Sequence, residues 1–71
     1  MDEVKFYSSV SGISRLVATI IYENNKISVH GRENYKTLLL RGAKDPEAIK
    51  QAMREAPKRF DGAYLKAEYI E

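Results

Sequence analysis

Cysteine is absent from this 71-residue chain, and histidine occurs once, as His30. The lack of cysteine excludes a disulfide framework, and a zinc site with several Cys or His ligands is excluded with it. His30 also has no neighbouring residue in the sequence with which it would form a catalytic base or a metal site. We therefore predict a non-enzymatic protein with no catalytic, cofactor-binding or metal-binding residues.

Long hydrophobic runs are absent as well. The longest apolar stretch, residues 16–22, includes a threonine and is much shorter than the roughly 20 residues that span a bilayer. The first residues contain neither a basic leader nor the apolar segment of a secretion signal. We therefore expect a cytoplasmic protein that makes no contact with a membrane.

Glycine and proline are few, with four and two residues, and they mark turns or helix ends. The glycines form no phosphate-binding loop and no dinucleotide-binding motif. The chain also shows no linker, repeat or low-complexity tract. These features predict a single domain, residues 1–71, without a cofactor.

The charge is small overall but unevenly distributed. The formal net charge is +2, yet residues 26–59 contain nine cations and four acids. The remaining residues carry three cations and six acids. This asymmetry is compatible with an acidic partner for the middle of the chain, and also with ordinary solubility.

Alternating apolar residues and tight-turn residues predict three strands, at residues 4–10, 14–23 and 26–30. Asn24 and Asn25 tolerate the positive φ of a two-residue hairpin turn, which would place Tyr22 opposite Ile27. The earlier turn, at residues 11–12, leaves two registers open. A two-residue turn would put Val4 and Phe6 on the face of Val17 and Ile21, and a loop of odd length would put them on the opposite face.

The second half of the chain predicts a fourth strand at residues 35–41, a helix at residues 46–56 and a last strand at residues 63–70. Asp45 is a good N-cap, and Pro46 suits the first helical position. Ile49 and Met53 belong to an apolar stripe with helical spacing, and Pro57 is expected to end the helix.

We therefore predict an α+β fold in the order ββββαβ, a small antiparallel sheet of four to five strands with one helix packed on one face. Within the second strand, alternate residues beginning at Leu16 would face the helix. The predicted core comprises Leu16, Ala18, Ile20, Ile27, Val29, Leu38, Leu40, Ile49, Ala52, Met53 and Leu65.

Apolar residues occur at both even and odd positions of two predicted strands, so both faces of the sheet need cover. A single helix covers one face only. The other face would display Val17, Ile21 and Leu39, which we predict to form an interface. The first functional hypothesis is a small interaction module that binds itself, as a homodimer, or another protein.

Basic and aromatic residues support a second hypothesis, a small DNA- or RNA-binding protein. Cations neutralise phosphates, and aromatic rings stack on bases, so a surface that mixes the two kinds is typical of single-strand binding. The candidate contacts for nucleic acid, or for an acidic partner, are Arg15, Lys26, Tyr35, Arg41, Lys50 and Arg54.

Overall fold

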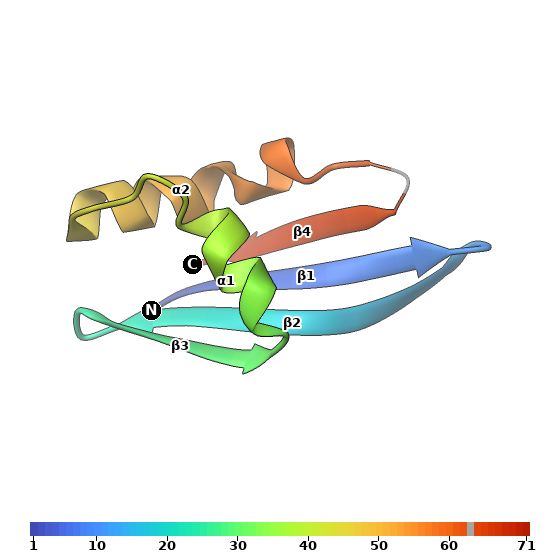
Figure 1. Ribbon diagram of the computed structural model, residues 1–71, viewed down its shortest axis with the longest axis horizontal. Coiled ribbons are helices and arrows are strands. Elements are labelled where there is room, and N and C mark those ends of the chain that lie inside the picture. Colours follow the sequence, from blue (N-terminus) through green and yellow to red (C-terminus); the bar gives the residue numbers. More distant parts are fainter. Residues whose placement is uncertain (63) are drawn as a thin grey trace.

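The computed structural model describes residues 1–62 and 64–71, which form a four-stranded antiparallel sheet and two helices (Figure 1). The elements in chain order are β1 (Asp2–Val10), β2 (Ile13–Glu23), β3 (Lys26–Gly31), α1 (Glu33–Leu39), α2 (Pro46–Arg59) and β4 (Leu65–Ile70). The order of strands in the sheet is β3-β2-β1-β4. The predicted α+β class and antiparallel sheet are confirmed, with two helices in place of one. Ala63, the first residue of the predicted last strand, lies outside the described residues.

Both hairpin turns contain two residues with positive φ. Asn24 and Asn25 have φ values of 52° and 60°, and Ser11 and Gly12 have values of 54° and 78°. These are the backbone angles that a type I′ turn requires, and this turn matches the twist of the two flanking strands. The predicted pairing of Tyr22 with Ile27 is confirmed.

A register shift between Phe6 and Tyr7 decides which residues of β2 face the helices. Phe6 pairs with Ala18, but Tyr7 pairs with Leu16, so Val17 is an extra residue on β2. Such a bulge reverses the alternation of side chains on the strand that contains it. Leu16 therefore lies on the open face and is 54% exposed. Its predicted core position was wrong.

The same bulge settles the register of β1. The turn at Ser11 and Gly12 has two residues, yet Val4 pairs with Ile20 and both side chains are fully buried. The extra residue on β2 places Val4 and Phe6 on the same face as Ile20, which is also the result expected for a turn with an odd number of residues. The face of Val4 and Phe6 is therefore the face that the helices cover.

Residues 35–41, predicted to be a strand, instead form most of α1 and the loop after it. Tyr35 and Leu39 are four residues apart, so they lie on one side of a helix. Leu39 is fully buried, and the ring of Tyr35 stacks on Phe6 at 5.3 Å. Leu38 is 43% exposed. The predictions of Leu38 in the core and Leu39 on an open sheet face were both wrong.

Helix α2 begins as predicted and continues further than predicted. The carboxylate of Asp45 accepts a hydrogen bond of 2.8 Å from the Ala48 N–H, as an N-cap does. The helix passes Pro57, which removes one hydrogen bond from its last turn, and it ends at Arg59. Tertiary contacts stabilise this last turn. Phe60 packs edge-on against Phe6, and Arg59 donates a hydrogen bond to the Leu38 carbonyl oxygen.

The hydrophobic core lies between the two helices and one face of the sheet. Phe6 is at its centre, with rings of Tyr35 and Phe60 each 5.3 Å away. Of the predicted core, Ala18, Ile20 and Met53 are buried, and the half-buried members are Ile27, Val29, Leu40, Ile49, Ala52 and Leu65. The complete set of buried residues is Val4, Phe6, Ala18, Ile20, Tyr22, Leu39, Met53, Ala56 and Ala67 among the described residues.

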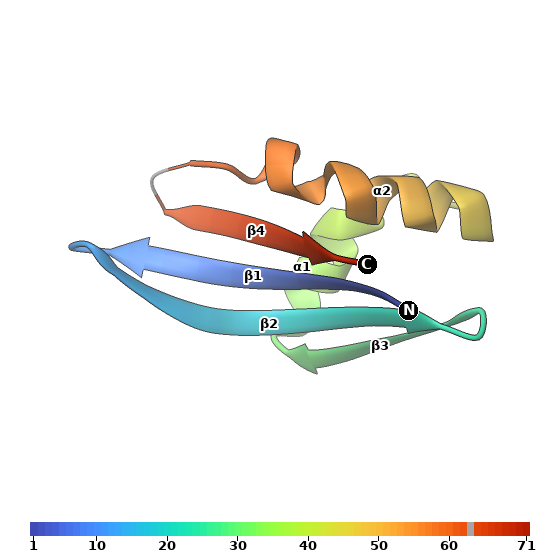
Figure 2. The same cartoon turned by 180° about the vertical axis from the view of Figure 1, so that it is seen from behind.

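Neither of the two described helices lies on the opposite face of the sheet (Figure 2). It is more polar than the sequence indicated, because Lys5 lies 3.7 Å from the Glu3 carboxylate and the Tyr7 hydroxyl donates to Glu68 at 3.3 Å. Ile21 pairs with Glu3 on this face and is half-buried. We call this surface the open face.

Candidate functional site

The β1–β2 hairpin extends beyond the rest of the sheet (Figure 1). β1 pairs with β2 as far as the turn, whereas β3 pairs only with residues 18–23 of β2. Over residues 13–17, the outer edge of β2 is therefore not paired with a strand in the part of the chain that the structure describes. Backbone N–H and C=O groups at such an edge are free to pair with another chain.

Gly31 explains why β3 leaves β2 at this point. It pairs with Ala18, and its φ of 109° lies in the left-handed region that favours glycine. A Cβ atom at Gly31 would lie 2.5 Å from the carbonyl oxygen of Val17, so the two backbones meet closely at the bulge. The chain then turns at Arg32 into α1, which leaves the edge beyond the bulge uncovered.

An open pocket of about 520 Å³ lies on this projecting hairpin. The pocket lies on the sheet face that the helices cover elsewhere. Ser8 and Val10 are two and four residues after the buried Phe6 on β1, so their side chains are on the same face as Phe6. We call it the hairpin pocket, and its lining residues are Ser8, Val10, Ser11, Ile13, Arg15, Val17 and Arg32.

Part of the wall of the hairpin pocket is apolar and exposed. Val10 and Ile13 pair across the two strands next to the turn, and their exposed fractions are 61% and 62%. Val17, which is half-buried, continues this apolar surface toward the core. Aliphatic side chains gathered on a projecting element are typical of a protein contact surface.

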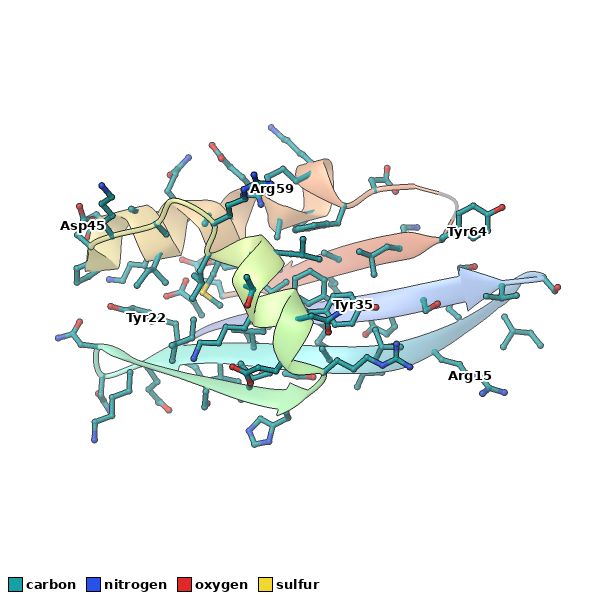
Figure 3. The ribbon with its side chains drawn as sticks, viewed as in Figure 1. Arg15, Tyr22, Tyr35, Asp45, Arg59 and Tyr64 are labelled. Atoms are coloured by element: carbon teal, nitrogen blue, oxygen red, sulfur yellow. The ribbon has the colours of Figure 1, made fainter. Side chains whose placement is uncertain are left out.

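Two arginines make the hairpin pocket positive. Arg15 projects from the part of β2 that extends past β3 (Figure 3), and Arg32 reaches the same pocket from the start of α1. The ion pairs within residues 1–62 and 64–71 are Lys5 with Glu3 and Lys36 with Glu33. Neither arginine takes part in them, so both are available to an acidic group from outside.

The predicted interface of Val17, Ile21 and Leu39 does not form a common surface. Val17 lines the hairpin pocket, Ile21 lies on the open face, and Leu39 is buried in the core. The strand predicted at residues 35–41 was the reason for grouping them. Because those residues form a helix, Leu39 faces inward.

The six predicted contacts for nucleic acid are also dispersed. Arg15 and Lys26 lie toward opposite ends of β2, since Lys26 pairs with Glu23. Tyr35 lies on α1 (Figure 3), and its ring stacks on Phe6 in the core, so it is not free to stack on a base. Arg41 is exposed in the loop after α1, and Lys50 and Arg54 lie on α2. The six predicted contacts therefore do not lie on one common surface.

Lys50 and Arg54 belong to the end of the molecule away from the hairpin pocket. Lys50 lines a polar pocket of about 260 Å³ beside the turn at Asn24 and Asn25. Near it, the Tyr69 hydroxyl donates a hydrogen bond to Asp2, and this bond raises the pKa of Tyr69, with burial as the second cause. Tyr69 in turn raises the pKa of Arg54. The hydrogen bond from Tyr69 to Asp2 joins β4 to the start of β1.

Replacing Tyr69 with phenylalanine should change how stability depends on alkaline pH. A tyrosine whose pKa is raised by folding stabilises the fold fully below its unfolded pKa, which is about 10, and this contribution is lost as pH rises through the higher folded value. Urea unfolding measured from pH 8 to pH 11 should therefore show a shallower loss of stability for Tyr69→Phe than for the wild type. Tyr64→Phe is the control, because Tyr64 is 77% exposed. Parallel pH profiles for Tyr69→Phe and the wild type would contradict a raised pKa of Tyr69 in the folded protein.

Sequence reasoning missed the apolar pair Val10 and Ile13, and it did not combine Arg15 with Arg32. A signal for this site was present in the predicted strand lengths. The strand at residues 14–23 was about twice as long as its partner at residues 26–30, and a two-residue turn joined them. The half of the longer strand that is remote from this turn therefore extends beyond its partner and is not paired with it.

The described residues contain no cluster of three side chains suited to hold a metal ion. Nor does either described helix have the length and hydropathy to cross a membrane. Comparison with protein-family models, curated protein sequences and solved structures found no match.

Proposed function

We propose that this chain is a small non-enzymatic interaction module that binds another protein through the hairpin pocket and the adjacent edge of β2. The observation that carries the proposal is the exposure of Val10 and Ile13 beside an unpaired strand edge. Exposed aliphatic side chains are unfavourable in water, and backbone groups at a strand edge can pair with another chain, so both together favour association. On the open face a single exposed aliphatic side chain, Leu16, lies beside this edge, and the interactions described on that face are the Lys5–Glu3 ion pair and the hydrogen bond from Tyr7 to Glu68.

Nucleic acid is the alternative partner, and the present geometry favours it less. The cations of α2 and those of the hairpin lie on different parts of the molecule, and Tyr35 is engaged with Phe6. Binding to nucleic acid would weaken steeply with salt, because it depends on the release of counterions. An interface with an apolar centre would persist at high salt.

Complex formation in an extract of the cells that produce the protein tests the proposal. Labelled chain should enter a larger complex, and excess unlabelled wild type should displace it. The variant Ile13→Glu should compete at least tenfold less well, because it places a charge at the centre of the apolar wall. Ser28→Glu, an exposed position on β3 away from the pocket, is the matched control and should compete like the wild type.

The same experiment contains the results that would overturn the proposal. Equal competition by Ile13→Glu and the wild type would show that the hairpin pocket is not the binding surface. Loss of the complex after nuclease treatment would identify nucleic acid as the partner. A larger species formed by the purified chain alone, and disrupted by Ile13→Glu, would show that the pocket serves self-association.

A further inference from the structure

We infer that the bare edge of β2 binds an extended acidic segment of the partner protein, which adds to the sheet as a fifth strand. This inference rests on the proposed function and specifies the chemistry of the partner. Strand addition is a common way for a sheet edge to recognise a peptide, with backbone hydrogen bonds for affinity and alternate side chains for specificity. The edge at residues 13–17 is suited to it because the pairing of β3 with β2 ends at Gly31 and Ala18, and the chain then turns into α1.

The backbone of β2 supplies the first part of the recognition. In an antiparallel ladder, every second residue directs its N–H and C=O away from its partner strand. Since β1 occupies one side of β2, the residues of this segment that do not bond to β1 present these groups outward. An added strand would continue the line of β3, which ends at Gly31 opposite Ala18.

The side chains indicate that the added strand is acidic. Residues on neighbouring strands that face the same side contact one another across the ladder. Arg15 and Ile13 are on the pocket side of β2, and Arg32 approaches from α1. A carboxylate beside Arg15 would acquire a cationic partner, and an aliphatic side chain two residues away would lie against Ile13. We expect a segment in which acidic and aliphatic residues alternate with outward-facing polar ones.

A second copy of this chain is a poor occupant of the same edge. Antiparallel pairing of two β2 edges over residues 13–17 would bring the Arg15 side chains of the two copies close together. Like charges on facing strands destabilise the pairing. Single-stranded nucleic acid would satisfy the arginines, but it would leave the outward N–H and C=O groups without the regular pairing that a peptide backbone supplies.

The test uses the whole ¹⁵N-labelled chain and a synthetic peptide, acetyl-Thr-Glu-Thr-Val-Thr-Glu-Thr-amide. Its glutamates and valine fall on one side of an extended strand, and its threonines fall on the other. Titration should produce saturable amide shifts concentrated at residues 13–17 and at Arg32. The same peptide with lysine in place of glutamate should bind at least tenfold more weakly. A peptide with N-methyl groups on alternate residues of its bonding edge should show a similar loss.

Variants of the protein test whether Arg15 and Arg32 supply the positive charge that binds the acidic peptide. Arg15→Gln should weaken binding of the acidic peptide at least fivefold, and Arg32→Gln should also weaken it. Lys26→Gln is the matched control, because Lys26 is an exposed cation next to the other turn of β2. It should bind the peptide as the wild type does.

Several outcomes would overturn the inference. These are shifts centred elsewhere, no saturable binding, equal binding of the N-methylated peptide, or tighter binding of a single-stranded oligonucleotide at the same residues. The proposed function can fail separately. If Ile13→Glu still loses its competition in the extract while the acidic peptide does not bind, the module binds a protein through this pocket, but not by addition of an acidic strand.

Discussion

Replacing Gly31 with alanine should destabilise the protein by about 3 kcal/mol, because two independent causes of strain act at this residue. Its φ of 109° is unfavourable for any residue with a Cβ atom. The Cβ atom would also lie 2.5 Å from the Val17 carbonyl oxygen and 2.9 Å from the Cα atom of Ala18. Both neighbours are backbone atoms that cannot rotate away. Urea unfolding at neutral pH, followed by circular dichroism, measures the change.

Gly42→Ala is the matched control for Gly31→Ala. Gly42 has a φ of 81°, and a Cβ atom there would meet no other atom within 4 Å. We expect a loss of about 1 kcal/mol from the backbone conformation alone. If the two substitutions had equal effects, the close approach of β3 to the bulge of β2 would be contradicted.

Replacing Phe6 with alanine should cost about 4 kcal/mol, the larger of the two effects. Phe6 is fully buried and contacts the rings of Tyr35 and Phe60, so it joins both helices to the sheet. A chain of this size has a total stability of roughly 4 to 10 kcal/mol. The variant should therefore be largely unfolded or melt at a much lower temperature, as measured by calorimetry or circular dichroism.

Tyr7→Ala is the comparison for Phe6→Ala on the neighbouring position of β1. Tyr7 points to the open face, is half-buried, and makes one hydrogen bond, to Glu68. Its loss should cost about 1 kcal/mol. A greater loss for Tyr7→Ala than for Phe6→Ala would show that the core lies on the other face of the sheet.

Local sequence signals predicted the elements whose stability is decided locally. The Asn24 and Asn25 turn, the Asp45 N-cap and the helical stripe on α2 each follow from backbone preferences and side-chain spacing, and each is confirmed. The segment at residues 35–41 was mistaken for a strand because a short apolar run fits either period. The spacing of Tyr35 and Leu39 fits a helix, and contact with Phe6 decides between the two.

The bulge at Val17 could not be predicted, because valine is an ordinary strand residue and nothing local marks the extra position. It lies where the pairing with β3 ends on one side of β2 while the pairing with β1 continues on the other. For this reason the sequence predicted the wrong sheet face for Leu16 and left the sheet face of Val4 undecided. The candidate site depends on this long-range arrangement, which is why the sequence placed Arg15 and Val17 on one sheet face but did not bring Val10, Ile13 and Arg32 to them.

The measurement that most directly tests the account is residue-resolved hydrogen exchange of the backbone amides in β2 of the isolated chain. The account predicts slow exchange throughout residues 18–22, where strands lie on both sides. It predicts that alternate amides of residues 13–17, directed to the bare edge, exchange close to the rate of an unprotected peptide. Slow exchange of every amide along β2 would contradict the account, because the edge proposed to bind a partner would then be already covered.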